Sequence, residues 1–179
     1  RLAGGIVCWW AIYGGTHGLL RDVLSGFGVR TRFVGLDELK APADVLSEAT
    51  RVLWFESPIN PTLRCLDIAA ISSACRERGV VSVIDNTFAS PLNQSPLEMG
   101  VDICMHSASK YLNGHSDLIA GAIAGRENLL RSIGLARRLV GTVLAPQAAY
   151  ALGRGLKTLS VRIERHKDRK STRLNFSPV

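Results

Sequence analysis

Short apolar runs recur along the chain, separated by stretches in which apolar residues fall on one helical face. Runs bounded by glycine, proline or polar residues are typical of buried strands. The predicted strands and a last apolar run are residues 5–12, 29–34, 51–55, 80–84, the run that starts at Ile103, and 118–124. Helical patterns occupy residues 17–27, part of 36–48, 67–78, 127–138 and 147–159, with a single turn at 95–99 and an extension toward Lys170.

Capping residues mark the expected starts of several helices. Asp67 is expected to cap the helix over 68–78, and Thr16 and Asp37 are expected to cap two earlier helical segments. Strands that alternate with helices predict parallel pairing in an open sheet with helices on both faces. The predicted fold class is therefore α/β with a mostly parallel sheet.

Polar or aromatic residues stand just after four of the predicted strands. In parallel strands these ends share one edge of the sheet, where open α/β sheets bind their ligands. Each residue alone has an ordinary explanation, such as a solvated lysine, a turn cap, turn hydroxyls or a core aromatic ring. Such explanations account poorly for the whole set, which is Tyr13, Glu56 with Asn60, Asp85, and Ser107, Ser109 and Lys110.

This combination of groups matches the requirements of pyridoxal 5′-phosphate (PLP). The aldehyde of PLP needs a lysine amine, for which Lys110 is the candidate. The pyridinium nitrogen needs a carboxylate such as Asp85, because the protonated ring is the electron sink. The phosphate needs donors such as Ser107 and Ser109, and the ring needs a flat partner such as Tyr13. The sequence therefore predicts a PLP site and no metal site.

Composition narrows the class of protein further. The chain has 179 residues, of which 46% are hydrophobic, and no apolar run approaches the length of a membrane-spanning helix. It starts at Arg1 without a signal-peptide pattern, and a cytoplasmic protein is expected. The cysteines lack metal-ligand spacing and are expected to be reduced and buried: Cys8, Cys65, Cys75 and Cys104.

The net charge of +7 raises an alternative, a basic module that binds nucleic acid. Residues 162–173 hold six basic and two acidic side chains, and so supply more than half of that charge. A charge run at a chain end is more often a solvated helix face than a binding patch. An enzyme with a small amino-acid substrate, and without nucleic-acid or membrane partners, is therefore favoured. A steep salt dependence of duplex DNA affinity would support the alternative.

Four motifs resemble the trans-sulfuration (Cys/Met metabolism) family of PLP-dependent enzymes. They are Tyr13–Thr16, Phe55–Pro58 with Asn60–Pro61, Val83–Phe88 and His106–Asp117. The family includes cystathionine γ-synthase, the cystathionine lyases, methionine γ-lyase and the homoserine sulfhydrylases. The resemblance covers about residues 6–166 and implies the large domain of the aspartate-aminotransferase-like fold, fold type I, in truncated form.

The resemblance also implies a role for each candidate residue. Lys110 would form the internal aldimine with PLP, and Asp85 would pair with the pyridinium nitrogen. Tyr13 would stack on the ring and serve as a proton donor or acceptor in catalysis. The remaining contacts would come from Asn60 to the phenolic oxygen of the ring, and from Ser107 and Ser109 to the phosphate.

Departures from the family pattern set the expected organisation. Family chains are more than twice as long, so residues 1–160 are expected to be part of a PLP-binding large domain. Residues 161–179 would start a connection to a C-terminal domain or form an off-family tail. Methionine γ-lyases have a cysteine where this chain has Gly15, and some γ-lyases have an arginine where it has Gly18.

The expected activity is β- or γ-elimination, or γ-replacement, on cystathionine, cysteine or an O-acylhomoserine. Alternatives within the family are an O-acylhomoserine sulfhydrylase and a methionine γ-lyase. By resemblance, the full-length protein is expected to be a homotetramer built from dimers. An inactive chain is a further alternative, because the resemblance places half of the site outside these residues.

Overall fold

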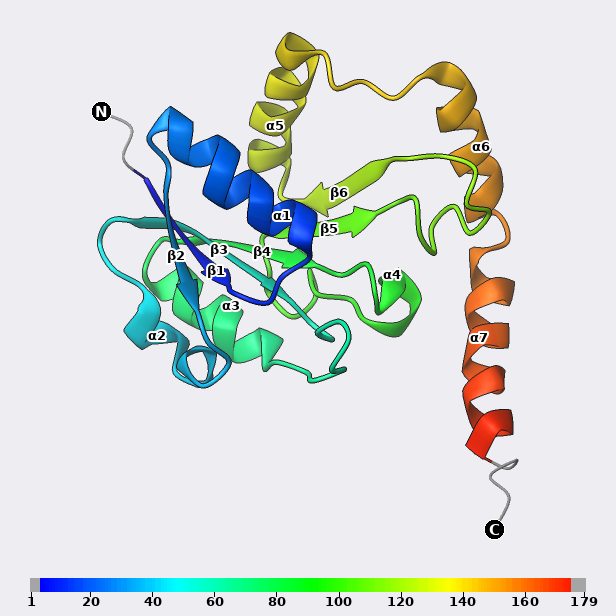
Figure 1. Ribbon diagram of the computed structural model, residues 1–179, viewed down its shortest axis with the longest axis horizontal. Helices are drawn as coiled ribbons and strands as arrows, with labels where there is room; N and C mark the ends of the chain where they lie inside the picture. The colour runs from blue at the N-terminus through cyan, green and yellow to red at the C-terminus, as the bar shows by residue number, and fades with distance from the viewer. Residues whose placement is uncertain (1–3, 175–179) are drawn as a thin grey trace.

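Six strands form one sheet in the order β2-β1-β3-β4-β5-β6 (Figure 1). The computed structural model describes residues 4–174, with side chains described to residue 168. The strands are β1 (Gly5–Trp9), β2 (Arg30–Val34), β3 (Thr50–Glu56), β4 (Val81–Asp85), β5 (Ile103–Ser107) and β6 (Gly121–Gly125). The predicted strands are therefore confirmed as elements, with small shifts at their ends.

Strands β1 to β5 are parallel, and β6 is antiparallel to β5. Crossover connections allow the parallel pairs, whereas a chain that turns back at the same edge pairs antiparallel. The segment after β5 makes such a return, and Ser107 then pairs with Gly121. The α/β class with a mostly parallel sheet is confirmed.

The helices lie on both sides of the strands: in Figure 1, α1 is above them and α2 and α3 are below. The first helical segment begins with α1 (Gly14–Gly18) and continues as a π-helix and a 3₁₀-helix to Phe27. A short 3₁₀-helix (Glu38–Lys40) precedes α2. The other helices are α2 (Pro42–Val45), α3 (Ile68–Glu77), α4 (Ser90–Asn93), α5 (Glu127–Val140), α6 (Pro146–Leu156) and α7 (Leu159–Leu174).

Of the three expected helix caps, only Asp67 makes the capping bond. Its carboxylate accepts a hydrogen bond from the Ala70 N–H at 2.9 Å. Thr16 does not cap, because the helix already begins at Gly14. Asp37 precedes a short 3₁₀-helix but makes no capping bond, because its carboxylate accepts from the Lys40 ammonium instead.

Two other helical expectations are corrected. Residues 95–99 form hydrogen-bonded turns rather than a helix, and the short helix α4 precedes them. The helix predicted over 147–159 ends at Leu156, and α7 begins at Leu159. The two residues between them form a turn, in which the Thr158 hydroxyl donates to the Gly155 carbonyl.

Two apolar clusters hold the elements together. The larger contains the fully buried side chains of β3 and β4, such as Phe55 and Ile84, together with Leu20 above and Ile71 of α3 below. The smaller joins the segment after β5 to α7, and its buried members are Ala108, Leu112, Leu159 and Ile163. Apolar burial stabilises roughly in proportion to the area buried, so the larger cluster stabilises the central strands and holds their ends in place.

The cysteines are free, as expected, but one is not buried. Cys8, Cys75 and Cys104 are buried, and burial raises the pKa of the Cys8 thiol to about 12. Cys65 is exposed, because it lies in the surface segment between β3 and α3. Within the described part of the chain, no helix is long and apolar enough to cross a membrane.

Replacing Asp67 with alanine is expected to lower the free energy of unfolding by about 1 kcal/mol, because the Ala70 N–H loses its acceptor. Urea denaturation of the full chain measures the change. Asp67→Asn is the matched control, since its side-chain oxygen can still accept the hydrogen bond, and it should remain close to the parent. An equal loss in both variants would contradict the capping role.

Candidate active site

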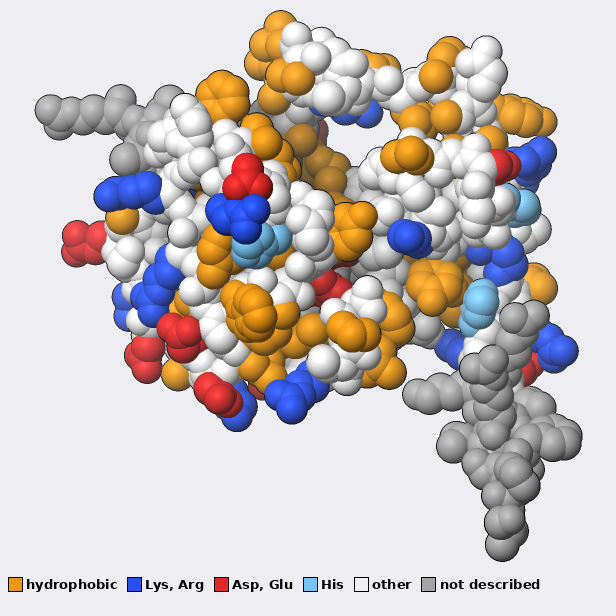
Figure 2. Space-filling view, viewed as in Figure 1, with side chains coloured by type: hydrophobic (Ala, Val, Ile, Leu, Met, Phe, Trp, Pro, Cys, Tyr) orange, Lys and Arg blue, Asp and Glu red, His pale blue; other side chains and the backbone are white. Residues whose placement is uncertain are grey.

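A cavity of about 930 Å³ opens at the carboxyl edge of the parallel strands. Figure 2 shows this face hollowed between the sheet with its covering helices and the pair of helices α6 and α7. A cavity of this size is in the range of small-molecule sites. All six predicted cofactor-binding residues line it: Tyr13, Asn60, Asp85, Ser107, Ser109 and Lys110.

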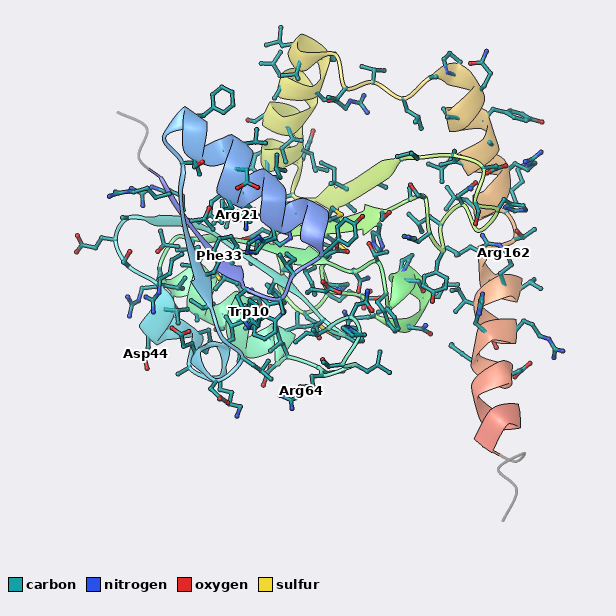
Figure 3. All side chains as sticks on the ribbon, viewed as in Figure 1. Trp10, Arg21, Phe33, Asp44, Arg64 and Arg162 are labelled. Atoms are coloured by element: carbon teal, nitrogen blue, oxygen red, sulfur yellow. The ribbon has the colours of Figure 1, made fainter. Side chains whose placement is uncertain are left out.

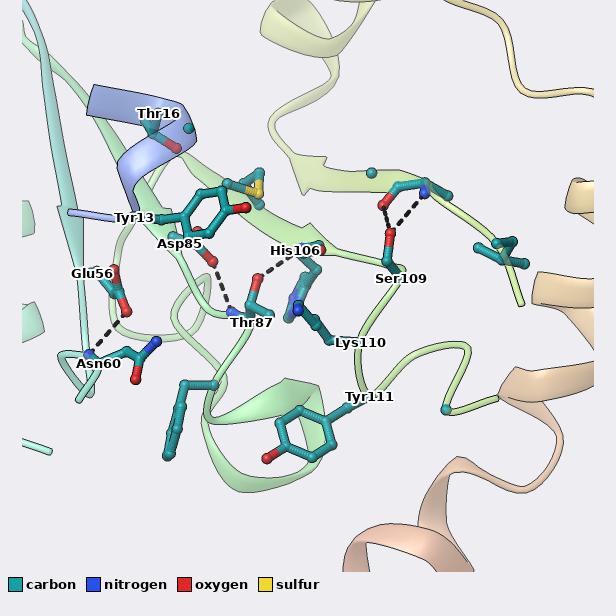
Figure 4. Close-up of a pocket in the computed structure, with 18 of the residues that line it drawn as sticks. Tyr13, Thr16, Glu56, Asn60, Asp85, Thr87, His106, Ser109, Lys110 and Tyr111 are labelled. Atoms are coloured by element: carbon teal, nitrogen blue, oxygen red, sulfur yellow. Dashed lines mark hydrogen bonds between the residues drawn. The ribbon is translucent and has the colours of Figure 1, made fainter. Parts of the chain in front are cut away.

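Strand register explains why these residues meet. Glu56 at the end of β3 pairs with Asp85 at the end of β4, and Asp85 pairs with Met105 near the end of β5. Since the three strands are parallel, their polar ends reach the same edge. Lys110 follows β5 and extends toward the middle of the cavity (Figure 4). The expected sharing of one edge by Asp85 and Lys110 is therefore found in the structure.

Asp85 is buried and linked to the next strand through Thr87. Its Oδ1 accepts from the Thr87 N–H at 2.9 Å, and Thr87 Oγ1 accepts from the Ser107 N–H at 2.7 Å (Figure 4). A buried carboxylate requires such hydrogen bonds to offset its lost hydration. Thr87 thus ties the ends of β4 and β5 together, a role that the sequence analysis had not given it.

Glu56 and Asn60 form the wall beside β3. The Asn60 N–H donates to Glu56 Oε1 at 3.1 Å. Burial raises the pKa of Glu56, and the nearby Asp85 charge raises it further, while the hydrogen bond from Asn60 acts in the opposite direction. The Asp85 carboxylate at the paired position of the adjacent strand thus disfavours the ionised form of Glu56, as expected for a like charge in the same site.

Ser107 is the last residue of β5, and Ser109 lies in the turn that follows, at the start of the segment that returns the chain to β6. Ser109 Oγ accepts from the Ala120 N–H at 2.9 Å, and the Ser109 N–H donates to the Ala120 carbonyl at 3.2 Å. The Lys110 N–H donates to the Ser107 carbonyl, and the Lys110 carbonyl accepts from the Gly114 N–H at 2.7 Å. The backbone of Lys110 is thus held on both sides while its side chain remains exposed to the cavity.

Tyr13 forms the wall that faces the lysine segment. Its side chain is 65% exposed, although it follows the buried end of β1. The ring leaves no room beside Gly15, where an added Cβ would lie 2.7 Å from Tyr13 Cε1. The expectation that Tyr13 belongs to the site rather than to the core agrees with this exposure.

His106 is a cavity residue that the sequence analysis did not select. It lies 3.3 Å from Cys104 Sγ through Nε2, and it is buried. Burial lowers the pKa of His106, and the Asp85 charge partly opposes this shift. It stands where the apolar run that starts at Ile103 turns polar, and it begins the motif His106–Asp117, but no role was predicted for it. Arg162 and His166, from α7, also line the cavity without having been selected.

An amine, a buried carboxylate, an aromatic ring and hydroxyl groups therefore surround one cavity on a mostly parallel sheet. The fold matches the crystal structure of cystathionine gamma-lyase from Lactobacillus plantarum complexed with L-serine. The TM-score is 0.85 at 41% sequence identity, over 90% of this chain and 42% of that one. This match defines the class as the fold type I PLP-dependent proteins.

The particular family follows from the sequence. Residues 3–174 match the model of the Cys/Met metabolism PLP-dependent enzymes, and the chain belongs to this family. It is 42% identical over 169 residues to the L-methionine gamma-lyase of Fusobacterium nucleatum, a match that covers 92% of this chain and 42% of that protein.

Other relatives carry different names. The identity is 41% to the cystathionine gamma-lyase of Macaca fascicularis, over 90% of this chain and 40% of that protein. It is 40% to the cystathionine beta-lyase of Coxiella burnetii, over 87% of this chain and 41% of that protein. The chain thus spans about two fifths of the length of the relatives that it matches.

The His106 ring is expected to be neutral at pH 7, because burial moves its pKa below the usual value of about 6.5. In Asp85→Asn the pKa should fall further, since the charge that favours the protonated ring is lost. NMR titration of the labelled imidazole measures both. Glu98→Gln removes an exposed carboxylate outside the cavity and should leave the titration unchanged. A rise in Asp85→Asn would contradict this electrostatic arrangement.

Proposed function

We propose that this chain carries the PLP-binding site of a carbon–sulfur lyase that acts on a sulfur-containing amino acid such as cystathionine. The observation that carries the proposal is the placement of Asp85 and Lys110 on one cavity, with Tyr13 opposite the lysine segment. Membership of a PLP-dependent family supports it, as do relatives named γ-lyases and β-lyases.

The residues present fit this cofactor. The Asp85 carboxylate is buried and uses one oxygen for the Thr87 N–H, so the other can accept from a protonated ring nitrogen. Ser107 and Ser109 provide hydroxyl groups on the lysine side of the cavity, where a phosphate would be held. Asn60 provides an amide on the β3 side, suited to a phenolic oxygen.

Lys110 is proposed to bind the cofactor and to move the substrate proton. When bound, PLP supplies an aldehyde carbon for an amine and a ring that stores negative charge. Once the amino-acid substrate has displaced it, the free Lys110 amine can accept the proton from the substrate α-carbon. Its backbone hydrogen bonds to Ser107 and Gly114 keep the start of the side chain in place for both tasks.

Tyr13 is proposed to hold the ring and to exchange a proton with the reacting carbons. Offset stacking of an aromatic side chain contributes about 1 kcal/mol beyond burial, so Tyr13 would orient the ring as well as cover it. Its phenol is exposed to the cavity, where it can donate a proton to a departing sulfur. Glu56 borders the same wall, where burial raises its pKa.

The close approach of the Tyr13 ring to Gly15 favours cystathionine over methionine as the substrate. The family resemblance implies a cysteine at the Gly15 position in methionine γ-lyases. Here a Cβ at that position would lie 2.7 Å from the Tyr13 ring, so the glycine permits this ring position. We base the choice of cystathionine on the Tyr13 ring, which packs closely against Gly15 and has no thiol at that position.

Lys110→Ala is expected to abolish the visible absorbance that appears when PLP is added to the full chain. After borohydride reduction, mass spectrometry should find the cofactor on the peptide that contains Lys110 in the parent protein. Lys157→Ala removes an exposed lysine in the turn between α6 and α7 and should leave both signals unchanged. Capture of the cofactor at another lysine would contradict the assignment.

Cystathionine is expected to yield a 2-oxo acid, ammonia and a thiol when incubated with the PLP-loaded protein. A four-carbon oxo acid with cysteine indicates γ-elimination, and pyruvate with homocysteine indicates β-elimination. Mass spectrometry of the products distinguishes the two. Turnover of O-acylhomoserine and cysteine to cystathionine, without oxo acid, would replace the lyase proposal by a γ-replacement enzyme.

A further inference from the structure

Arg162 on α7 reaches the segment that carries Lys110. Its Nη1 donates to the Tyr111 carbonyl at 2.7 Å, and its Nη2 donates to the Leu112 carbonyl at 3.3 Å. Figure 3 places Arg162 at the junction of α6 and α7, beside this segment. A helix far along the chain thus holds the backbone directly after the candidate lysine.

The guanidinium is almost fully used by the protein itself. Nη2 also donates to the Gly155 carbonyl at 2.8 Å, and Nε donates to Thr158 Oγ1 at 3.1 Å. Of the five N–H groups of an arginine, four are therefore engaged in fixed directions. Although Arg162 lines the cavity, its donors are committed to the segment and to the turn before α7 rather than to a ligand.

Two glycines permit this close approach. Gly114 has a φ of +74°, and a Cβ at this position would collide with the Arg162 guanidinium. A Cβ at Gly155 would collide with the Asn113 carbonyl. The backbone of the lysine segment and the α6–α7 junction therefore meet without intervening side chains, which leaves little freedom in their relative position.

Apolar and ring contacts from α7 act on the same segment. Leu159 and Ile163 pack against Ala108 and Leu112, on either side of Lys110 in the sequence. One helical turn after Arg162, the His166 ring meets the Tyr111 ring edge-on, with centroids 5.6 Å apart. Three independent kinds of contact thus dock α7 onto residues 108–114.

We propose that Arg162 is a positioning residue that sets how far the Lys110 amine reaches into the cavity. By bonding to the two carbonyls that follow Lys110, it fixes the turn from which the side chain departs. This inference rests on the proposed function, because it concerns capture of the cofactor aldehyde by Lys110. It also makes that capture depend on the placement of α7, which contributes Arg162 from outside the sheet.

The test compares an aldehyde with its alcohol on the full chain. With PLP, the Lys110 nitrogen attacks the aldehyde carbon and water leaves, giving a C=N bond that borohydride reduces to a stable amine. Pyridoxine 5′-phosphate has the same ring and phosphate but cannot form this bond. Arg162→Met should slow capture of PLP about tenfold to a hundredfold, as a displacement of about 1 Å can. Affinity for pyridoxine 5′-phosphate should be unchanged.

Arg165→Met is the matched control. Arg165 lies on the same helix and forms an ion pair with Asp168, at 3.9 Å. It should capture PLP at the parental rate. Arg162→Lys keeps the charge but not the planar fork, so it should recover only part of the capture rate. It also serves as the second variant if Arg162→Met does not fold, which circular dichroism would reveal.

Each outcome separates the two proposals. If the parent protein captures PLP at Lys110 and Arg162→Met does so equally fast, the positioning role is overturned while the proposed function stands. Equal weakening of PLP and pyridoxine 5′-phosphate would also overturn it, since that result indicates a phosphate contact or general loss of structure. If the parent protein itself captures no PLP at Lys110, the proposed function fails.

Discussion

The parallel pairing of β3, β4 and β5 is the constraint on which the candidate site depends. It places Glu56 next to Asp85 and brings the segment after β5 to the same edge. Hydrogen bonds along a parallel ladder fix the register of the strands, and a slip of one residue would turn a polar end toward the other face. Thr87 reinforces this alignment beyond the last ladder bond, because it connects Asp85 to the backbone of Ser107. The chemistry of the cavity is therefore a consequence of sheet geometry.

Burial gives the gathered groups unequal electrostatic character. Glu56 and Asp85 are both only 7% exposed, and the pKa of Glu56 is raised by burial and by its neighbour's charge. His106 lies on the same edge, and its burial lowers its pKa. The lysine segment on the opposite side provides the hydroxyl and amine groups.

The sequence allowed the strands, and the residues that gather around the cavity, to be predicted, because both leave local signals. Apolar runs ending in Glu56, Asp85 and Ser107 mark strand ends, and parallel topology then brings those ends together. Features that depend on long-range packing were missed. Arg162 binds carbonyls about fifty positions earlier in the chain, and nothing in its own surroundings distinguishes it from the other basic residues of the terminal charge run. The predicted caps at Thr16 and Asp37 were wrong. A suitable residue type permits a helix to start at a position, but the backbone dihedral angles determine whether it does.

The reversal of the chain between β5 and β6 has a consequence for how the site assembles. Its two flanking strands are neighbours in sequence as well as in space, so their contacts have low contact order and a small loop-closure entropy. The ends of β1, β3 and β4, in contrast, come next to the segment between β5 and β6 only after whole crossover connections have been ordered. The candidate lysine therefore resides in the part of the cavity that requires the least chain entropy to form, and the carboxylate and aromatic walls must be brought to it.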